Sequence, residues 1–87
     1  RYYDADAVAI ATASAGFARH GVEARHLRAW RTSAEREVSL FEQVVMPLLR
    51  QRNPQARTQA AATLDELADL GSSLREVLVR RAQRQVH

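Results

Sequence analysis

Apolar residues recur at helical spacing along nearly the whole chain, and no stretch alternates between apolar and polar residues as a half-buried strand does. The spacing divides the chain into three segments, at about residues 5–20, 24–50 and 54–85. Sixteen alanines reinforce this pattern because alanine is the strongest helix former. The sequence therefore predicts an all-α fold with three main helices, in which the second and third form a long antiparallel hairpin packed on the shorter first helix.

The first predicted helix has a signal at each end. Asp4 can accept hydrogen bonds from the free N–H groups of the first turn, and Gly21 suits the left-handed position that often follows a helix. If Gly21 takes that position, Val22 falls where it can pack back on Phe17. The helix between these ends has a broad face of mostly small apolar residues, so we expect other backbones to approach it closely.

The second predicted helix carries a seam of about four heptads. Its apolar residues stand seven apart, at Leu27, Ala34, Phe41 and Leu48. The phase continues through residues 32–33 and favours one helix from about residue 24 to 50, although Thr32 and Glu35 also fit a capping box that would start a new helix. Pro47 lacks an N–H, so it is expected to kink or fray the last turn.

Asn53 and Pro54 form a helix-start signal, an N-cap followed by proline in the first turn. One apolar seam of this third helix steps by three and four residues, through Leu64, Leu67, Gly71, Leu74 and Leu78. A glycine inside a helix is destabilising by about 1 kcal/mol relative to alanine, so Gly71 predicts the close approach of another helix. Because these faces are too wide for an 87-residue chain to cover, we expect this seam to contribute to a homodimer interface.

All thirteen basic residues are arginine, and the formal net charge is +3. Basic and acidic blocks alternate along the chain, which is typical of antiparallel helices that pair with each other or with a second copy. This pattern favours a solvated mixed-charge surface over a phosphate-binding patch, so DNA contact is expected outside this chain. The absence of cysteine fits a reducing compartment such as the cytoplasm, and no apolar run approaches the roughly 20 residues that span a bilayer. No membrane partner is expected.

Neither a catalytic site nor a metal site is expected from the sequence. His20, Glu23 and His26 stand three apart, but Gly21 interrupts the helix that would align them as ligands. The chain has no cysteine nucleophile and no glycine-rich phosphate loop. We therefore predict that the protein is not an enzyme and needs no cofactor.

Aromatic residues offer a candidate site for a small apolar ligand or a peptide, because such sites are mostly apolar with few polar anchors. The residues concerned are Tyr2, Tyr3, Phe17, Trp30 and Phe41. Alternatively, the last three are core residues and the two tyrosines dock the first helix onto that core. A filled core and a pocket use the same residue types at the same spacing, so both interpretations stay open.

Three runs of residues resemble the C-terminal domain of actinobacterial MerR-family regulators of the FtsR type. They are Tyr2-Tyr3-Asp4, Gly21-Val22-Glu23 and Arg25-His26-Leu27-Arg28-Ala29-Trp30-Arg31. The resemblance is strongest over residues 2–49 and weaker over the third helix. An alanine-rich composition without lysine agrees with an actinobacterial origin.

The resemblance implies that residues 1–87 are a single regulatory and dimerisation domain of a dimeric transcription regulator with a proposed link to cell-division genes. A separate N-terminal winged helix would bind DNA, and because no initiator methionine precedes Arg1, we expect this chain to be a fragment that lacks it. RNA polymerase is a further candidate partner, through Arg25, Arg28 and Arg31. Metal-sensing MerR relatives bind ions through thiolates, so a metal effector is not expected here.

Overall fold

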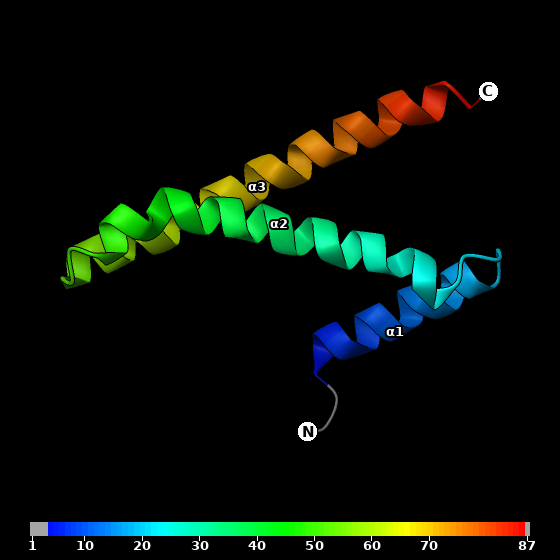
Figure 1. The fold of residues 1–87 in the computed structure, drawn as a ribbon, viewed down its shortest axis with the longest axis horizontal. Coiled ribbons are helices and arrows are strands. Elements are labelled where there is room, and N and C mark those ends of the chain that lie inside the picture. The colour runs from blue at the N-terminus through cyan, green and yellow to red at the C-terminus, as the bar shows by residue number, and fades with distance from the viewer. Residues whose placement is uncertain (1–3, 87) are drawn as a thin grey trace. The chain divides into compact units, whose positions relative to one another are not determined.

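A computed structural model describes residues 4–86 of the chain, which form three α-helices joined by short loops (Figure 1). The helices are α1 (Ala5–Ala18), α2 (Ala24–Leu49) and α3 (Pro54–Arg84). Residues 4–86 contain no strand, so the predicted all-α class and the number of helices are confirmed. The chain divides into an N-terminal unit, residues 1–35, and a C-terminal unit, residues 36–87, and α2 contributes to both.

Both predicted end signals of α1 are present. The Asp4 carboxylate accepts a hydrogen bond from a first-turn N–H at 2.7 Å. At the other end Gly21 has a left-handed φ of +82°, and the N–H of Val22 donates to the carbonyl of Phe17 at 3.0 Å. This is the hydrogen bond of a Schellman motif. The helix ends at Ala18, slightly earlier than expected, because the chain then tightens into turns.

α2 is one continuous helix, so the alternative of a new helix starting at Thr32 is wrong. Its first turn is closed by His26, whose Nδ1 accepts a hydrogen bond from the N–H of Glu23 at 2.9 Å. A side chain in the third helical position that reaches back in this way supplies one half of a capping box. The helix contains Pro47 and ends two residues later at Leu49, as the missing N–H of proline predicts.

α3 begins as the sequence predicts and returns alongside α2. The Asn53 side chain accepts a hydrogen bond from the N–H of Ala56 at 2.8 Å, and Pro54 is the first helical residue. The loop before it turns sharply through Arg52, whose φ is +53°. Residues 36–49 of α2 and all of α3 therefore form an antiparallel hairpin, which confirms the predicted pairing of the two helices.

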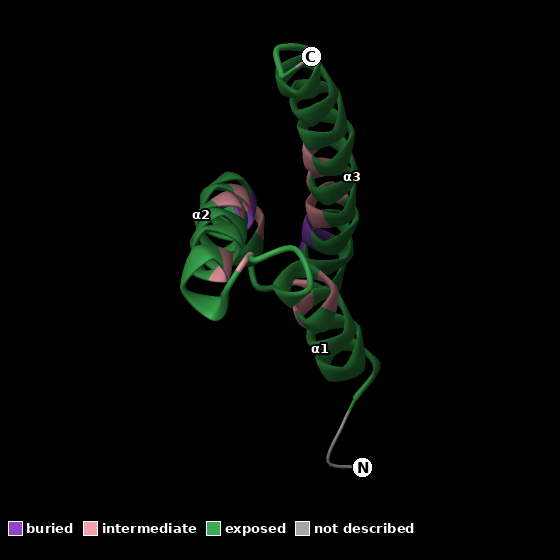
Figure 2. Ribbon diagram, turned by 90° about the vertical axis from the view of Figure 1, so that its right-hand side faces the viewer, coloured by how far each residue is buried: buried purple, intermediate pink, exposed green. Residues whose placement is uncertain are grey.

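The hairpin is held by a narrow core. Its buried side chains are Val45 of α2 and Ala56 and Ala60 of α3, which lie on the facing sides of the two helices (Figure 2). Because two of these three are alanines, the helix backbones can approach closely, but little apolar area leaves water. Half-buried side chains extend the seam away from the loop, among them Phe41, Leu64 and Leu67.

Gly71 lies where side chains of α2 come into close contact with α3. A Cβ atom placed there would overlap the Glu37 carboxylate, with the Glu37 Cδ at 3.2 Å and the Phe41 Cζ at 3.4 Å. The same carboxylate accepts a hydrogen bond from the Arg75 guanidinium one turn along α3. The close approach predicted at Gly71 is thus confirmed, and the approaching helix is α2 of the same chain.

Replacing Gly71 by leucine should destabilise the hairpin by about 1–3 kcal/mol, the usual range for overpacking, despite the better helix propensity of leucine. Gly16→Leu is the matched control, since a Cβ at Gly16 would meet nothing closer than the Arg19 guanidinium at 3.6 Å. Urea unfolding followed by circular dichroism measures both changes. A Gly71→Leu protein as stable as the parent would contradict the close contact.

Candidate interaction surfaces

The hairpin carries large apolar side chains that its own chain leaves in contact with water. Leu40 is 58% exposed, Leu70 is 59% exposed and Leu74 is 60% exposed. Val44 and Val77 are exposed as well. Leucine and valine contribute strongly to stability only when they are removed from water, so these five side chains form a candidate surface for a partner. We refer to them as the apolar stripe.

The members of the stripe from both helices share one face of the hairpin. Leu40 precedes the seam residue Phe41 by one position, and Leu70 precedes Gly71 in the same way, so each lies about 100° around its helix from the contact line. Two antiparallel helices are related by an approximate twofold axis normal to the plane that contains them. Rotation about this axis keeps each face of the hairpin on its own side. Residues that precede the contact line by one position on either helix therefore lie on the same face of the hairpin. The stripe consequently crosses from α2 to α3.

The five residues predicted for a dimer interface divide into two groups. Leu64, Leu67 and Gly71 are half-buried on the side of α3 that meets α2. Leu74 and Leu78 lie further along α3, beyond the contact at Gly71, and more than half of each side chain is exposed. Only the second group is available to a second copy without opening the hairpin.

The predicted aromatic group is brought together only in part. In the N-terminal unit, the Phe17 and Trp30 rings lie with centroids 5.3 Å apart and planes inclined by 40°. Phe17 is 36% exposed and Trp30 is 60% exposed, so the expectation that they are core residues is wrong for the chain by itself. Phe41 belongs to the C-terminal unit, where it is half-buried near Gly71. Tyr2 and Tyr3 lie outside the described residues.

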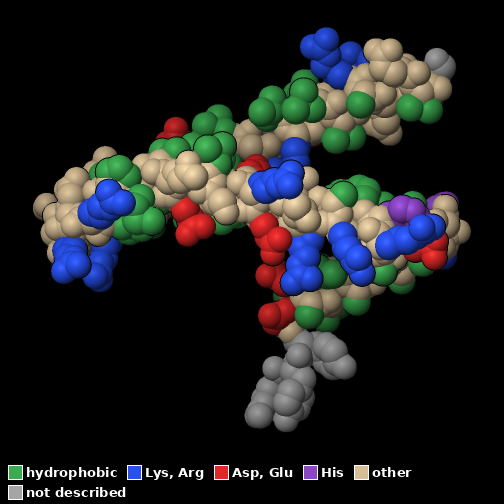
Figure 3. Space-filling model, in the orientation of Figure 1, with side chains coloured by type: hydrophobic (Ala, Val, Ile, Leu, Met, Phe, Trp, Pro, Cys, Tyr) green, Lys and Arg blue, Asp and Glu red, His purple; other side chains and the backbone are tan. Residues whose placement is uncertain are grey.

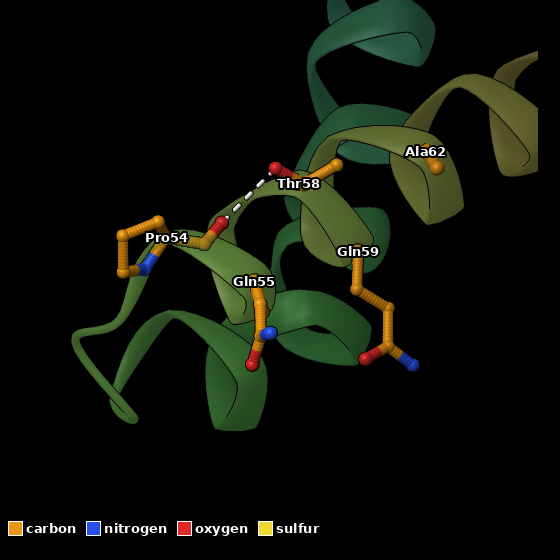
Figure 4. Close-up of a pocket in the computed structure, with 5 residues that line it drawn as sticks. All are labelled: Pro54, Gln55, Thr58, Gln59 and Ala62. Atoms are coloured by element: carbon orange, nitrogen blue, oxygen red, sulfur yellow. Dashed lines mark hydrogen bonds between the residues drawn. The ribbon is translucent and has the colours of Figure 1, made fainter.

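Two surface depressions on the hairpin bear on the predicted ligand site. One is lined by Pro54, Gln55, Thr58, Gln59 and Ala62 at the start of α3 (Figure 4). Another lies near the end of α2, between Glu42 and Arg50. Neither is lined by an aromatic residue, so these depressions add no support to the predicted ligand site.

The polar residues singled out in the sequence are exposed, and several of them are locally paired. His26 uses its Nδ1 to cap α2, and residues 4–86 contain no group of three or more side chains that could hold a metal ion. Arg25 pairs with Glu23 at 3.1 Å, and Arg31 pairs with Glu35 at 3.8 Å. A contact between these arginines and RNA polymerase stays a prediction.

Two features of these surfaces were missed by reasoning from the sequence. Leu40 was not singled out. Its place just before the seam residue Phe41 could have indicated an exposed apolar position beside the contact between the helices. The pairing of Glu37 with Arg75 joins residues 38 positions apart and has no local signature.

No helix in the described part of the chain is long and apolar enough to cross a membrane.

Comparison with known proteins identifies relatives among bacterial regulators. The HTH-type transcriptional regulators Rv1828 of Mycobacterium tuberculosis and Mb1859 of Mycobacterium bovis are each 36% identical to the chain over 85 residues. The match covers 98% of the chain but only 34% of each regulator, so the chain spans about a third of the length of these relatives. No solved structure matches the chain significantly.

A family model described as Rv1828-like, C-terminal domain matches residues 1–87, the whole length of the chain. Together with the two mycobacterial relatives, this match confirms the expected relation to a C-terminal domain of transcriptional regulators. The chain therefore belongs to the family of Rv1828-like C-terminal domains.

Proposed function

We propose that this chain is the non-enzymatic regulatory domain of a cytoplasmic transcription regulator and that it joins two copies of that regulator. Family membership and the HTH-type relatives support the regulatory role. The observation that carries the self-association is the apolar stripe on the hairpin, which the chain does not cover. The resemblance to FtsR-type members of the MerR family adds the finer proposal that cell-division genes are the targets.

The stripe favours a partner because helical spacing places its exposed members on one face of the hairpin. Isolated apolar residues are common on protein surfaces, whereas a connected patch rimmed by charges is typical of an interaction site. Leu74 and Val77 continue the patch from the α2–α3 seam along the half of α3 beyond Gly71. A small domain with a core of one valine and two alanines gains most by burying that patch.

A second copy suits this surface because the charges on α3 are self-complementary. Asp65, Glu66 and Asp69 precede the exposed leucines, and Arg80, Arg81 and Arg84 follow them. If two α3 helices cross antiparallel about a twofold axis near Leu74, each acidic segment meets the arginines of the other copy. A parallel pairing would bring like charges together. The charge order therefore favours an antiparallel dimer with Leu74 near its centre.

Such a dimer would set the spacing at which the regulator reads DNA. DNA-binding domains held by a twofold-symmetric partner domain contact two half-sites at a separation fixed by the protein. In this proposal the winged helix that reads the sequence is a separate domain outside these 87 residues, and the hairpin determines the distance between two such domains.

Charges introduced at the stripe residue Leu74 and at the neighbouring exposed Leu78 should separate the dimer. We expect the parent chain to sediment as a dimer at micromolar concentration and the double variant Leu74→Asp, Leu78→Asp to sediment as a monomer, because carboxylates would have to leave water at the interface. Val86→Asp, at the exposed end of α3, is the control and should remain dimeric. A monomeric parent chain in sedimentation velocity would refute the proposal.

The antiparallel order can be tested with single cysteines because the chain has none of its own. Ser73→Cys lies next to the proposed axis, so two copies should oxidise readily to a disulfide-linked dimer. Gln83→Cys lies far from the axis and should not link to its counterpart. Non-reducing electrophoresis compares the two variants, and linkage of both would indicate a parallel pairing instead.

A second candidate function is the binding of an apolar molecule or a peptide at the contact of Phe17 and Trp30. The observation in its favour is that Trp30 is 60% exposed beside another aromatic ring, which leaves an unshielded apolar platform in the N-terminal unit. A ligand that bound there with different affinity in two dimer arrangements would shift their populations.

Trp30 is the single tryptophan and therefore reports directly on this site. Phe17→Ala should increase the quenching of Trp30 emission by acrylamide, since the only aromatic neighbour in the described residues is removed, whereas Ile10→Ala on the same helix should not. A screen of metabolites and peptides should then find a compound that shifts the Trp30 emission of the parent. The same compound should cause a smaller shift in Phe17→Ala. If no compound changes emission or melting temperature, the site has no such ligand.

A further inference from the structure

The tip of the hairpin, residues 50–63, differs in composition from the rest of the C-terminal unit. It holds three arginines, at positions 50, 52 and 57, and neither an acidic nor a large apolar residue. These are the only basic residues between Arg36 and Arg75. In Figure 3 basic side chains gather on the visible face at this end of the hairpin.

The arginines of the tip have no carboxylate partners within the described structure. Arg50, Arg52 and Arg57 are exposed, and none of them appears in an ion pair or donates a side-chain hydrogen bond to a residue between positions 4 and 86. By contrast, Arg75 and Arg80 on α3 each pair with a glutamate. Three guanidinium groups at one end of the molecule are therefore available to an anion.

Arg52 occupies a backbone conformation that favours glycine. Its φ of +53° lies in the left-handed region, and it is the only residue other than glycine with a positive φ between residues 4 and 86. A side chain that is kept at such a position despite the backbone strain is a reason to look for function. The guanidinium of Arg52 offers that function, since the turn itself would form more easily with glycine.

The neighbours of the arginines are hydrogen-bonding residues of the kind that contact nucleic-acid backbones. Figure 4 shows the Gln55 and Gln59 amides extending to the same side of α3, one helical turn apart. Arginine, glutamine and threonine side chains commonly bind phosphate and sugar oxygens. A protein partner would be expected to find an apolar centre, and the tip has none.

We propose that the hairpin tip binds the phosphate backbone of duplex DNA, without reading its sequence, through Arg50, Arg52 and Arg57. The choice of DNA rests on the proposed role in a DNA-binding regulator. The tip then adds a salt-sensitive contact to the sequence-specific contacts of a separate domain, because each arginine that neutralises a phosphate releases a counterion. This contact is separate from the apolar stripe, so it does not depend on how two copies pair.

The test uses fluorescence anisotropy of a labelled duplex of arbitrary sequence, titrated with the 87-residue chain at several salt concentrations. Replacing Arg50, Arg52 and Arg57 by alanine should weaken binding at low salt by about tenfold or more. Each neutralised phosphate contributes roughly 0.9 to the magnitude of the slope of log Kobs against log salt. The three replacements should therefore reduce the magnitude of that slope by about 2 to 3. The matched control replaces Arg19, Arg28 and Arg36 by alanine, which removes the same charge from exposed positions outside the tip and outside the proposed dimer contact. Equal losses in both triple variants would overturn the proposal.

Arg52→Gly separates binding from folding. It should melt at the same temperature as the parent or higher, because glycine suits the positive φ, and should still lose about 1 from the salt slope. Poly-L-glutamate is titrated in the same way. If the parent binds it as tightly as DNA, and if Arg52→Gly weakens both interactions equally, the tip is a site for an acidic protein and the proposal is overturned. Sedimentation of the parent and of the same variants distinguishes failure of this proposal from failure of the proposed self-association. A parent chain that is dimeric but does not bind DNA refutes only the DNA contact at the tip, whereas a monomeric parent chain refutes the self-association.

Discussion

The close approach of α2 and α3 is the constraint on which the rest of this structure depends. Small residues make it possible: Ala56 and Ala60 lie against α2 near the loop, and Gly71 leaves the space that the Glu37 carboxylate fills. Helices that meet through small side chains approach closely but bury little apolar surface. Val45 is the one buried residue larger than alanine within residues 4–86.

The narrow seam explains why so much apolar surface remains on the outside. Because small residues occupy much of the contact line, Leu70 stands beside it and Leu74 beyond it, and both remain exposed. A domain of this size buries a limited fraction of its surface even when its core is well filled. The proposed pairing of two copies would supply the burial that the hairpin alone lacks, and the order of charges on α3 accounts for the direction of that pairing.

Different stretches of the hairpin carry different chemistry, and the structure keeps them apart. The tip is polar and basic, the middle presents leucines and valines, and the far end of α3 is rich in arginine. A regulator benefits from this separation because self-association and contact with an anionic partner then use distinct surfaces. The aromatic pair of Phe17 and Trp30 belongs to the N-terminal unit and adds a third surface of its own kind.

The sequence by itself determined the helices and their ends. Heptad spacing, the caps at Asp4 and Asn53, and the left-handed Gly21 act over a few residues, so they are legible without any tertiary information. The exposure of Phe17 and Trp30 and the pairing of Glu37 with Arg75 were decided only in three dimensions. Spacing shows that a face is apolar, but which helix covers that face depends on the approach distance between residues far apart in the chain. That is why Gly71 was expected to meet a helix, while only the folded hairpin revealed that the helix is α2 of the same chain.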